Sequence, residues 1–153
     1  MPELSKRVGE FTDSVIRRMT RISDATPGSI NLSQGFPDFD PPQVLLDALR
    51  EMAGGGEQHQ YSVTYGSENL RRCIAEKYSP IHGYEIDPET QVVVTCGGTE
   101  AMMAAMMTVC NPGDKVIVFS PFYENYGADA ILSGAEPIYV PLVPPTFNYD
   151  SKV

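Results

Sequence analysis

The C-terminal part of the sequence alternates short apolar runs with helix-forming runs. Apolar runs at 92–95, 115–120 and 137–142 have the length and β-branched content of buried strands. Helix-forming runs lie between them at 99–110 and 124–133. Strands that alternate with helices pair in parallel, because a right-handed crossover returns the chain to the same edge of the sheet. The sequence therefore predicts an α/β fold with part of a mainly parallel sheet covered by helices.

Three helices are predicted before residue 91, with irregular segments between them. Residues 4–22 place apolar side chains at helical spacing, which predicts an amphipathic helix packed on a core; a basic membrane-surface helix is the alternative. These apolar residues are Val8, Phe11, Val15, Met19 and Ile22. Two more helices are predicted at 43–53 and 67–79, and the segment Pro80–Pro88 is typical of a turn region.

Charge and cysteine usage exclude some partners. The formal net charge of the 153 residues is −9, which argues against nucleic acid and anionic membrane surfaces. No apolar run approaches the length of a membrane span. The cysteines lack metal-ligand spacing, so we expect reduced thiols in a cytoplasmic protein and no metal site. They are Cys73, Cys96 and Cys110.

A glycine turn, Gly97-Gly98-Thr99, joins the apolar run 92–95 to the next predicted helix, with the Thr99 hydroxyl expected at the helix cap. Backbone N–H groups at a helix start lack partners and carry the positive end of the helix dipole, so a phosphate is the usual ligand there. The spacing matches neither the dinucleotide-binding fingerprint nor the Walker loop. A structural turn without a ligand is therefore an equal alternative.

Two other loops have unusual sequences. Residues 29–42 combine three prolines with Gly35 and aromatic residues, so they form either a plain connection or a loop that wraps a site. The aromatic residues within 121–126 either cover the core or stack on a flat ligand ring. Because loops 96–99 and 120–124 follow parallel strands, we expect both at the same edge of the sheet, where ligands bind.

Five segments, in this order and spacing, resemble the class I/II aminotransferases, which are fold-type-I enzymes dependent on pyridoxal phosphate. They are Asn31–Phe39; Gln60-Tyr61 with Tyr65-Gly66 and Leu70-Arg71; Thr95–Ala101; Asn111–Asp114; and Pro121–Tyr123 with Tyr126. The resemblance implies that residues 1–40 are an N-terminal arm and part of the small domain. It also implies that residues 41–153 are the first half of the cofactor-binding large domain.

The resemblance assigns cofactor roles to several residues. Gly98, Thr99 and the N–H of Glu100 are similar to the turn that binds the phosphate of pyridoxal 5'-phosphate. Tyr123 occupies the place of the aromatic residue that stacks on the pyridine ring. Tyr61 resembles the tyrosine whose hydroxyl reaches the cofactor phosphate of the neighbouring subunit, which implies a homodimer.

The resemblance also implies a reaction. The family moves an amino group from an L-amino acid to a 2-oxo acid, and Gly35 resembles the loop glycine that lies against the substrate carboxylate. Within the family, a β-lyase or an aminocyclopropane-carboxylate-type synthase is the alternative. From a different class, the alternative is a non-catalytic α/β domain that binds a phosphorylated ligand or a partner chain.

We expect no catalytic residue in this chain. The family's Schiff-base lysine lies downstream of the region that the resemblance covers. Lys115 opens the predicted strand 115–120 at its amino end, on the wrong edge of the sheet. The other lysines, on helix surfaces or in the tail, are Lys6, Lys77 and Lys152. The chain is therefore predicted to be the N-terminal portion of an aminotransferase and to be inactive alone.

Overall fold

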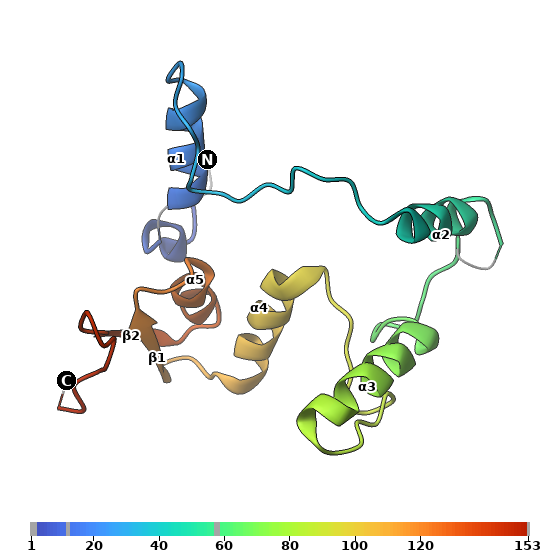
Figure 1. Ribbon diagram of the computed structural model, residues 1–153. Helices are drawn as coiled ribbons and strands as arrows, with labels where there is room; N and C mark the ends of the chain where they lie inside the picture. Colours follow the sequence, from blue (N-terminus) through green and yellow to red (C-terminus); the bar gives the residue numbers. More distant parts are fainter. Residues whose placement is uncertain (1–2, 12, 57–58, 153) are drawn as a thin grey trace. The chain divides into compact units, whose positions relative to one another are not determined.

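The computed structural model describes residues 3–11, 13–56 and 59–152. Figure 1 shows its helices and strands along the chain. Among the described residues, no helix combines the length and the apolar character that a membrane crossing requires.

The chain divides into two compact units, one formed by Met1–Gln34 with Cys96–Val153 and the other by Gly35–Thr95. The boundary expected at residue 40 stays a prediction, because contacts within this chain alone do not define a small and a large domain.

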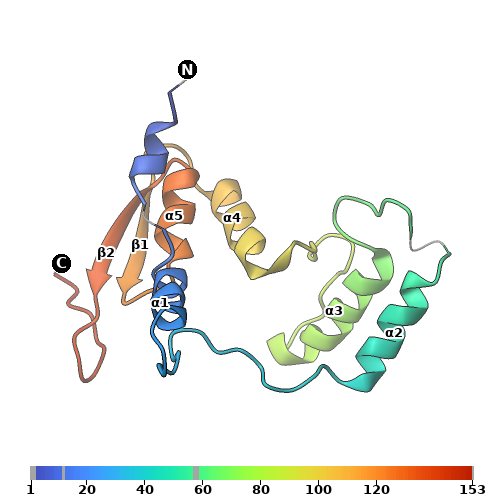
Figure 2. The same ribbon diagram turned by 90° about the horizontal axis from the view of Figure 1, so that it is seen from above.

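The first unit contains the predicted strand–helix–strand alternation. Strand β1 (Lys115–Ser120) pairs in parallel with β2 (Glu136–Pro141), with Lys115 opposite Glu136. Helix α5 (Asn125–Leu132) makes the crossover and packs on both strands (Figure 2). The buried apolar residues of this unit are Val118, Ala130, Ile131, Ala135 and Val140. The prediction of an α/β fold with a parallel sheet is confirmed.

Helix α4 (Gly97–Val109) packs on α5 and begins at Gly97 rather than at the predicted Thr99. Its N-cap is Cys96, whose N–H donates to the Glu100 carboxylate, so the predicted Thr99 cap is wrong. A carboxylate that reaches back to the N-cap N–H satisfies one of the unpaired donors of the first turn. The Thr99 hydroxyl is left without a capping role.

The N-terminal segment forms two short helices instead of the single helix predicted over 4–22. They are the 3-10 helix η1 (Lys6–Gly9) and helix α1 (Val15–Asp24). The Ser14 hydroxyl accepts the Arg17 N–H at 3.3 Å, which starts a new helix inside the continuous periodic pattern. None of the described residues of α1 is buried, so the expected packing of its apolar face on a core is also wrong for this chain.

The second unit contains two of the predicted helices. Helix α2 (Gln43–Ala53) matches its prediction, and α3 (Glu68–His82) begins after the expected cap, Ser67. Helix α3 continues through Pro80, where a turn region was predicted. Proline removes a backbone donor, and the helix ends shortly afterwards at His82. Gly83 follows as the C-cap, and its φ of +74° is typical of a glycine there.

The strand predicted at 92–95 is not formed. The Val94 N–H donates to the Tyr65 carbonyl at 2.9 Å, but within the described part of the chain only β1 and β2 form a sheet. A strand needs a neighbour for its hydrogen-bond ladder. The apolar run therefore forms no ladder with another strand among the described residues.

A buried arginine joins two loops of the second unit. The Arg71 guanidinium donates to the Gly66 carbonyl at 3.1 Å and to the Pro88 carbonyl, and it pairs with the Glu89 carboxylate at 3.2 Å. Only 3% of Arg71 is exposed, whereas charged residues are rarely buried unless they are paired. Arg71 therefore holds the loop before α3 against the segment that follows it.

A buried carboxylate in α5 is expected to make the stability of the protein depend on pH. Asp129 is 5% exposed, and its Oδ2 has no hydrogen-bond partner among the described residues. Burial raises the pKa of this carboxyl above its ordinary value, because the charged form loses its water. The folded protein thus holds the proton more tightly than the unfolded chain, and stability falls as pH rises from the unfolded pKa through the higher folded pKa.

Replacing Asp129 by asparagine is therefore expected to raise the free energy of unfolding at pH 7, and the gain should vanish below about pH 4, where the unfolded carboxyl is also protonated. Urea titrations at both pH values measure this. Asp87→Asn is the control of opposite sign. Hydrogen bonds from Thr90 and Glu89 lower the pKa of Asp87, so its contribution is present at neutral pH and is lost as pH falls through the folded pKa. Equal effects of both substitutions would contradict the prediction.

Candidate functional site

The first unit brings together the glycine turn and the aromatic loop that the sequence singled out. Asn125 Nδ2, at the start of α5, donates to Thr99 Oγ1, in the first turn of α4, at 3.1 Å. This contact brings the starts of α4 and α5 together. The prediction that loops 96–99 and 120–124 lie at one edge of the sheet is not confirmed, because the run before the first loop is not a strand among the described residues.

An open cavity of about 380 Å³ lies between these two helix starts. It is lined by Gly98, Thr99, Met102, Tyr123, Asn125 and Tyr126. The Tyr123 and Tyr126 rings meet edge to face, with centroids 5.9 Å apart, and Tyr123 is half exposed. A flat ring has an aromatic partner here, in a cavity of the size that small ligands occupy.

The backbone at the glycine turn leaves space for an anion. A Cβ added to Gly98 would meet no atom of the described residues within 4 Å. The N–H groups of Gly98 and Thr99 belong to the first turn of α4, where helix geometry supplies no backbone acceptor. The helix dipole places partial positive charge at the same point. The turn therefore fits a phosphate, and the adjacent Tyr123 fits the ring that carries it.

Glu100 lies differently from the other residues of the turn. Its carboxylate accepts the Cys96 N–H, and Cys96 is the N-cap of α4. The N-cap carbonyl accepts the first intrahelical hydrogen bond, which comes from the residue four positions later. Helix geometry thus directs the Glu100 N–H to the Cys96 carbonyl. The predicted role of this N–H at the phosphate stays a prediction.

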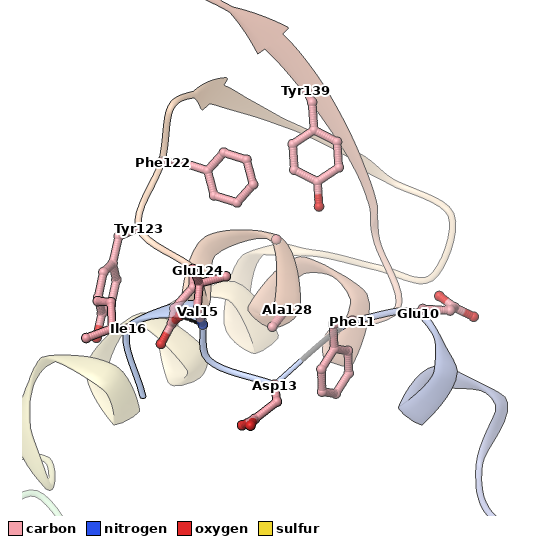
Figure 3. A pocket seen from close by; sticks show the side chains of 11 residues that line it. Glu10, Phe11, Asp13, Val15, Ile16, Phe122, Tyr123, Glu124, Ala128 and Tyr139 are labelled. Atoms are coloured by element: carbon pink, nitrogen blue, oxygen red, sulfur yellow. Dashed lines mark hydrogen bonds between the residues drawn. The ribbon is translucent and has the colours of Figure 1, made fainter. Parts of the chain in front are cut away.

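A second cavity, shown in Figure 3, lies on the side of Tyr123 that faces the N-terminal segment. Phe122 and Tyr139 stack there with centroids 5.0 Å apart. The cavity is also lined by three carboxylates, those of Glu10, Asp13 and Glu124. Negative charge disfavours a phosphate, so the cavity at the glycine turn is the better anion site.

Two of these carboxylates, those of Asp13 and Glu124, have hydrogen-bond partners in the N-terminal segment. The Arg21 guanidinium, at 2.7 Å, is the main cause that lowers the pKa of Asp13, together with the Ser14 N–H. The Glu124 carboxylate accepts the Val15 N–H at 3.2 Å. The N-terminal segment is therefore tied to the loop that carries Tyr123.

The remaining predicted site residues lie in the second unit. Gly35 is exposed, and Tyr61 is fully exposed. Their predicted roles, at the substrate carboxylate and at a neighbouring subunit, stay predictions. Asn125 is the residue to which sequence reasoning gave no role. The sequence shows a polar residue at a predicted helix start close to Tyr123. The contact of this residue with Thr99 depends on how α4 packs on α5, which the sequence does not show.

The chain matches a protein-family model over residues 27–152, and that model describes the class I and II aminotransferases. The chain belongs to this family. The family uses pyridoxal phosphate, and its members act on amino acids and 2-oxo acids. Among the described residues, no group of three or more His, Cys, Asp or Glu side chains could hold a metal ion.

Individual aminotransferases support the family assignment. The chain is 39% identical to a probable N-succinyldiaminopimelate aminotransferase of Mycobacterium tuberculosis over 90% of its length, and 41% identical to the methionine aminotransferase of Escherichia coli over 80%. These alignments cover 34% and 31% of the two relatives, so the chain spans about a third of their length.

Solved structures show the same fold. The N-succinyldiaminopimelate aminotransferase structure from Mycobacterium tuberculosis matches 96% of this chain with a TM-score of 0.83 at 37% identity. The Escherichia coli methionine aminotransferase structure matches 98% with a TM-score of 0.87 at 34% identity. The chain covers 38% and 39% of those two structures. The described α/β arrangement is therefore part of the fold-type-I architecture.

Proposed function

We propose that the complete protein is an aminotransferase that moves an amino group from an L-amino acid to a 2-oxo acid. We further propose that this chain supplies the residues that bind the phosphate of the cofactor and stack on its ring. The observation that supports this most strongly is the cavity shared by Gly98, Thr99 and Tyr123. An anion-binding helix start and an aromatic face are the two features that a phosphorylated pyridine ring requires.

Each residue has a defined task in this proposal. The N–H groups of Gly98 and Thr99 and the Thr99 hydroxyl bind the phosphate, and Tyr123 orients the ring. Bound pyridoxal phosphate supplies the electron sink that activates the substrate α-carbon. Gly35 lies against the substrate carboxylate, and proton transfer belongs to a lysine outside this chain.

The assembly and the location of the protein are also proposed. Tyr61 is fully exposed, which suits a side chain that reaches the cofactor phosphate of a partner subunit in a homodimer. The cysteines are free thiols (Cys73, Cys96 and Cys110). Free thiols suit the reducing cytoplasm, where we place the enzyme.

The test compares the complete protein with this chain. With pyridoxal phosphate, amino acids and 2-oxo acids, the complete protein is expected to transaminate and to elute as a dimer in light scattering, whereas the chain alone should release no 2-oxo acid. Turnover by the chain alone would refute the proposal that proton transfer requires a lysine outside this chain. A complete protein that only cleaves a cysteine conjugate would instead be a β-lyase, and one that binds the cofactor without turnover would be a non-catalytic domain.

A further inference from the structure

A hydrogen bond inside the candidate site determines whether the Thr99 hydroxyl can donate its hydrogen to a ligand. Asn125 Nδ2 donates to Thr99 Oγ1 at 3.1 Å. An amide nitrogen is a donor only, so the Thr99 oxygen is the acceptor in this bond. A hydroxyl carries one hydrogen and two lone pairs, and the Thr99 hydrogen is therefore left for a different acceptor.

We propose that Asn125 is a positioning residue that keeps the Thr99 hydroxyl as a donor to the cofactor phosphate. This rests on the proposed function, because it concerns the same phosphate site. A phosphate presents mostly acceptor oxygens, so a hydroxyl helps to bind it only when its hydrogen points to the phosphate. Without the Asn125 donor, both lone pairs of the Thr99 oxygen are free, and this contact no longer restricts where the hydroxyl hydrogen points.

The location of Asn125 also links the two halves of the site. Asn125 is the first residue of α5, and Tyr123 lies in the loop immediately before this helix. Both side chains line the same cavity. A variant that only loosens this loop would disturb ring stacking as well as phosphate binding, whereas loss of the proposed role would disturb phosphate binding alone.

The experiment measures the dissociation constants of pyridoxal phosphate and of pyridoxal, which lacks the phosphate, for the complete protein. Asn125→Ala is compared with the wild type, and the same substitution is made in a Thr99→Ala background. We expect Asn125→Ala to weaken pyridoxal phosphate binding about tenfold, the scale of one hydrogen bond to a charged group. Pyridoxal binding should change less than about twofold, and the Thr99→Ala background should show no further loss.

Two results would overturn the inference. Equal weakening of both ligands would show that Asn125 only holds the loop, and an undiminished effect in the Thr99→Ala background would show that it does not act through Thr99. Asn125→Asp provides a second variant, because aspartate suits a helix start but accepts the Thr99 hydrogen. Its affinity for pyridoxal phosphate should fall further than that of Asn125→Ala, and wild-type affinity would overturn the inference.

A different result would refute the proposed function itself. A wild-type protein that binds pyridoxal phosphate no more tightly than pyridoxal would refute the phosphate site, and the role of Asn125 with it. A wild type that prefers the phosphorylated ligand, combined with an Asn125→Ala variant of the same preference, would refute the role of Asn125 alone.

Discussion

Replacing Arg71 by methionine is expected to lower the free energy of unfolding by about 2–4 kcal/mol, because the Gly66 and Pro88 carbonyls lose a charged donor inside the second unit. The methionine retains an apolar stem of similar length, so the loss reports mainly on the hydrogen bonds. The pair with Glu89 adds little, since the Glu89 side chain is 62% exposed. Urea unfolding of the chain measures the change.

The neighbouring Arg72 provides a matched control. It lies on the same helix and loses the same charge when it is replaced by methionine, but its side chain is 55% exposed and lies 3.9 Å from Glu76. We expect Arg72→Met to change stability by less than about 0.5 kcal/mol. Similar losses for both variants would show that charge or helix propensity, and not the buried contacts, is responsible.

Hydrogen exchange gives a local test of the same prediction. The Val94 N–H donates to the Tyr65 carbonyl, and Tyr65 precedes the Gly66 that Arg71 holds. Loss of Arg71 should therefore speed exchange at Val94 more than at amides in the middle of α2. Unchanged protection of the Val94 amide would show that Arg71 does not stabilise this loop.

The parts of the fold that local sequence determines were predicted well. The limits of β1 at Lys115 and Ser120 were predicted correctly, because a β-branched run between a turn and Pro121 leaves little choice. The limits of α2 were also correct, since a glycine run follows its last residue, Ala53. The parallel pairing of β1 with β2 followed from the helix between them.

The errors occur where one local signal competes with another or where a distant partner decides. The apolar periodicity over 4–22 continues across Ser14, but the Ser14 cap divides the segment into two helices. The run 92–95 has strand-like composition, yet a ladder requires a neighbour that composition does not reveal. Helix α3 continues past Pro80 to His82, although a proline in a helix removes a hydrogen bond and usually ends or kinks the helix.

The candidate site shows the same division between local and distant information. The sequence predicted Gly98, Thr99 and Tyr123 at one edge of a parallel sheet. All three line one cavity, although the run before Gly97 is not a strand among the described residues. Sequence reasoning assigned no role to Asn125, since the bond with Thr99 depends on the packing of α4 against α5. The resemblance identified Gly35 and Tyr61, and neither residue is in the unit that holds the other three.

The second large effect is expected at Gly98. A Cβ added at this position meets no described atom within 4 Å beyond its own helix backbone and chain neighbours, and valine costs less than glycine inside a helix, so Gly98→Val should fold with unchanged or slightly higher stability. The same side chain would fill the space over the first-turn N–H groups. We expect pyridoxal phosphate binding by the complete protein to weaken about 100-fold or more, since at least one hydrogen bond to a charged group is lost and the phosphate is displaced.

Gly9→Val is the matched control for Gly98→Val. A Cβ at Gly9 also meets no described atom within 4 Å, and Gly9 is not among the residues that line the cavity at the glycine turn. Thermal unfolding and cofactor titration of both variants separate folding from binding. A Gly98→Val protein that folds and binds pyridoxal phosphate as tightly as Gly9→Val would show that the phosphate does not lie over Gly98. Weak binding by Gly98→Val alone places the phosphate at the start of α4, because the added atoms can then interfere only with the ligand.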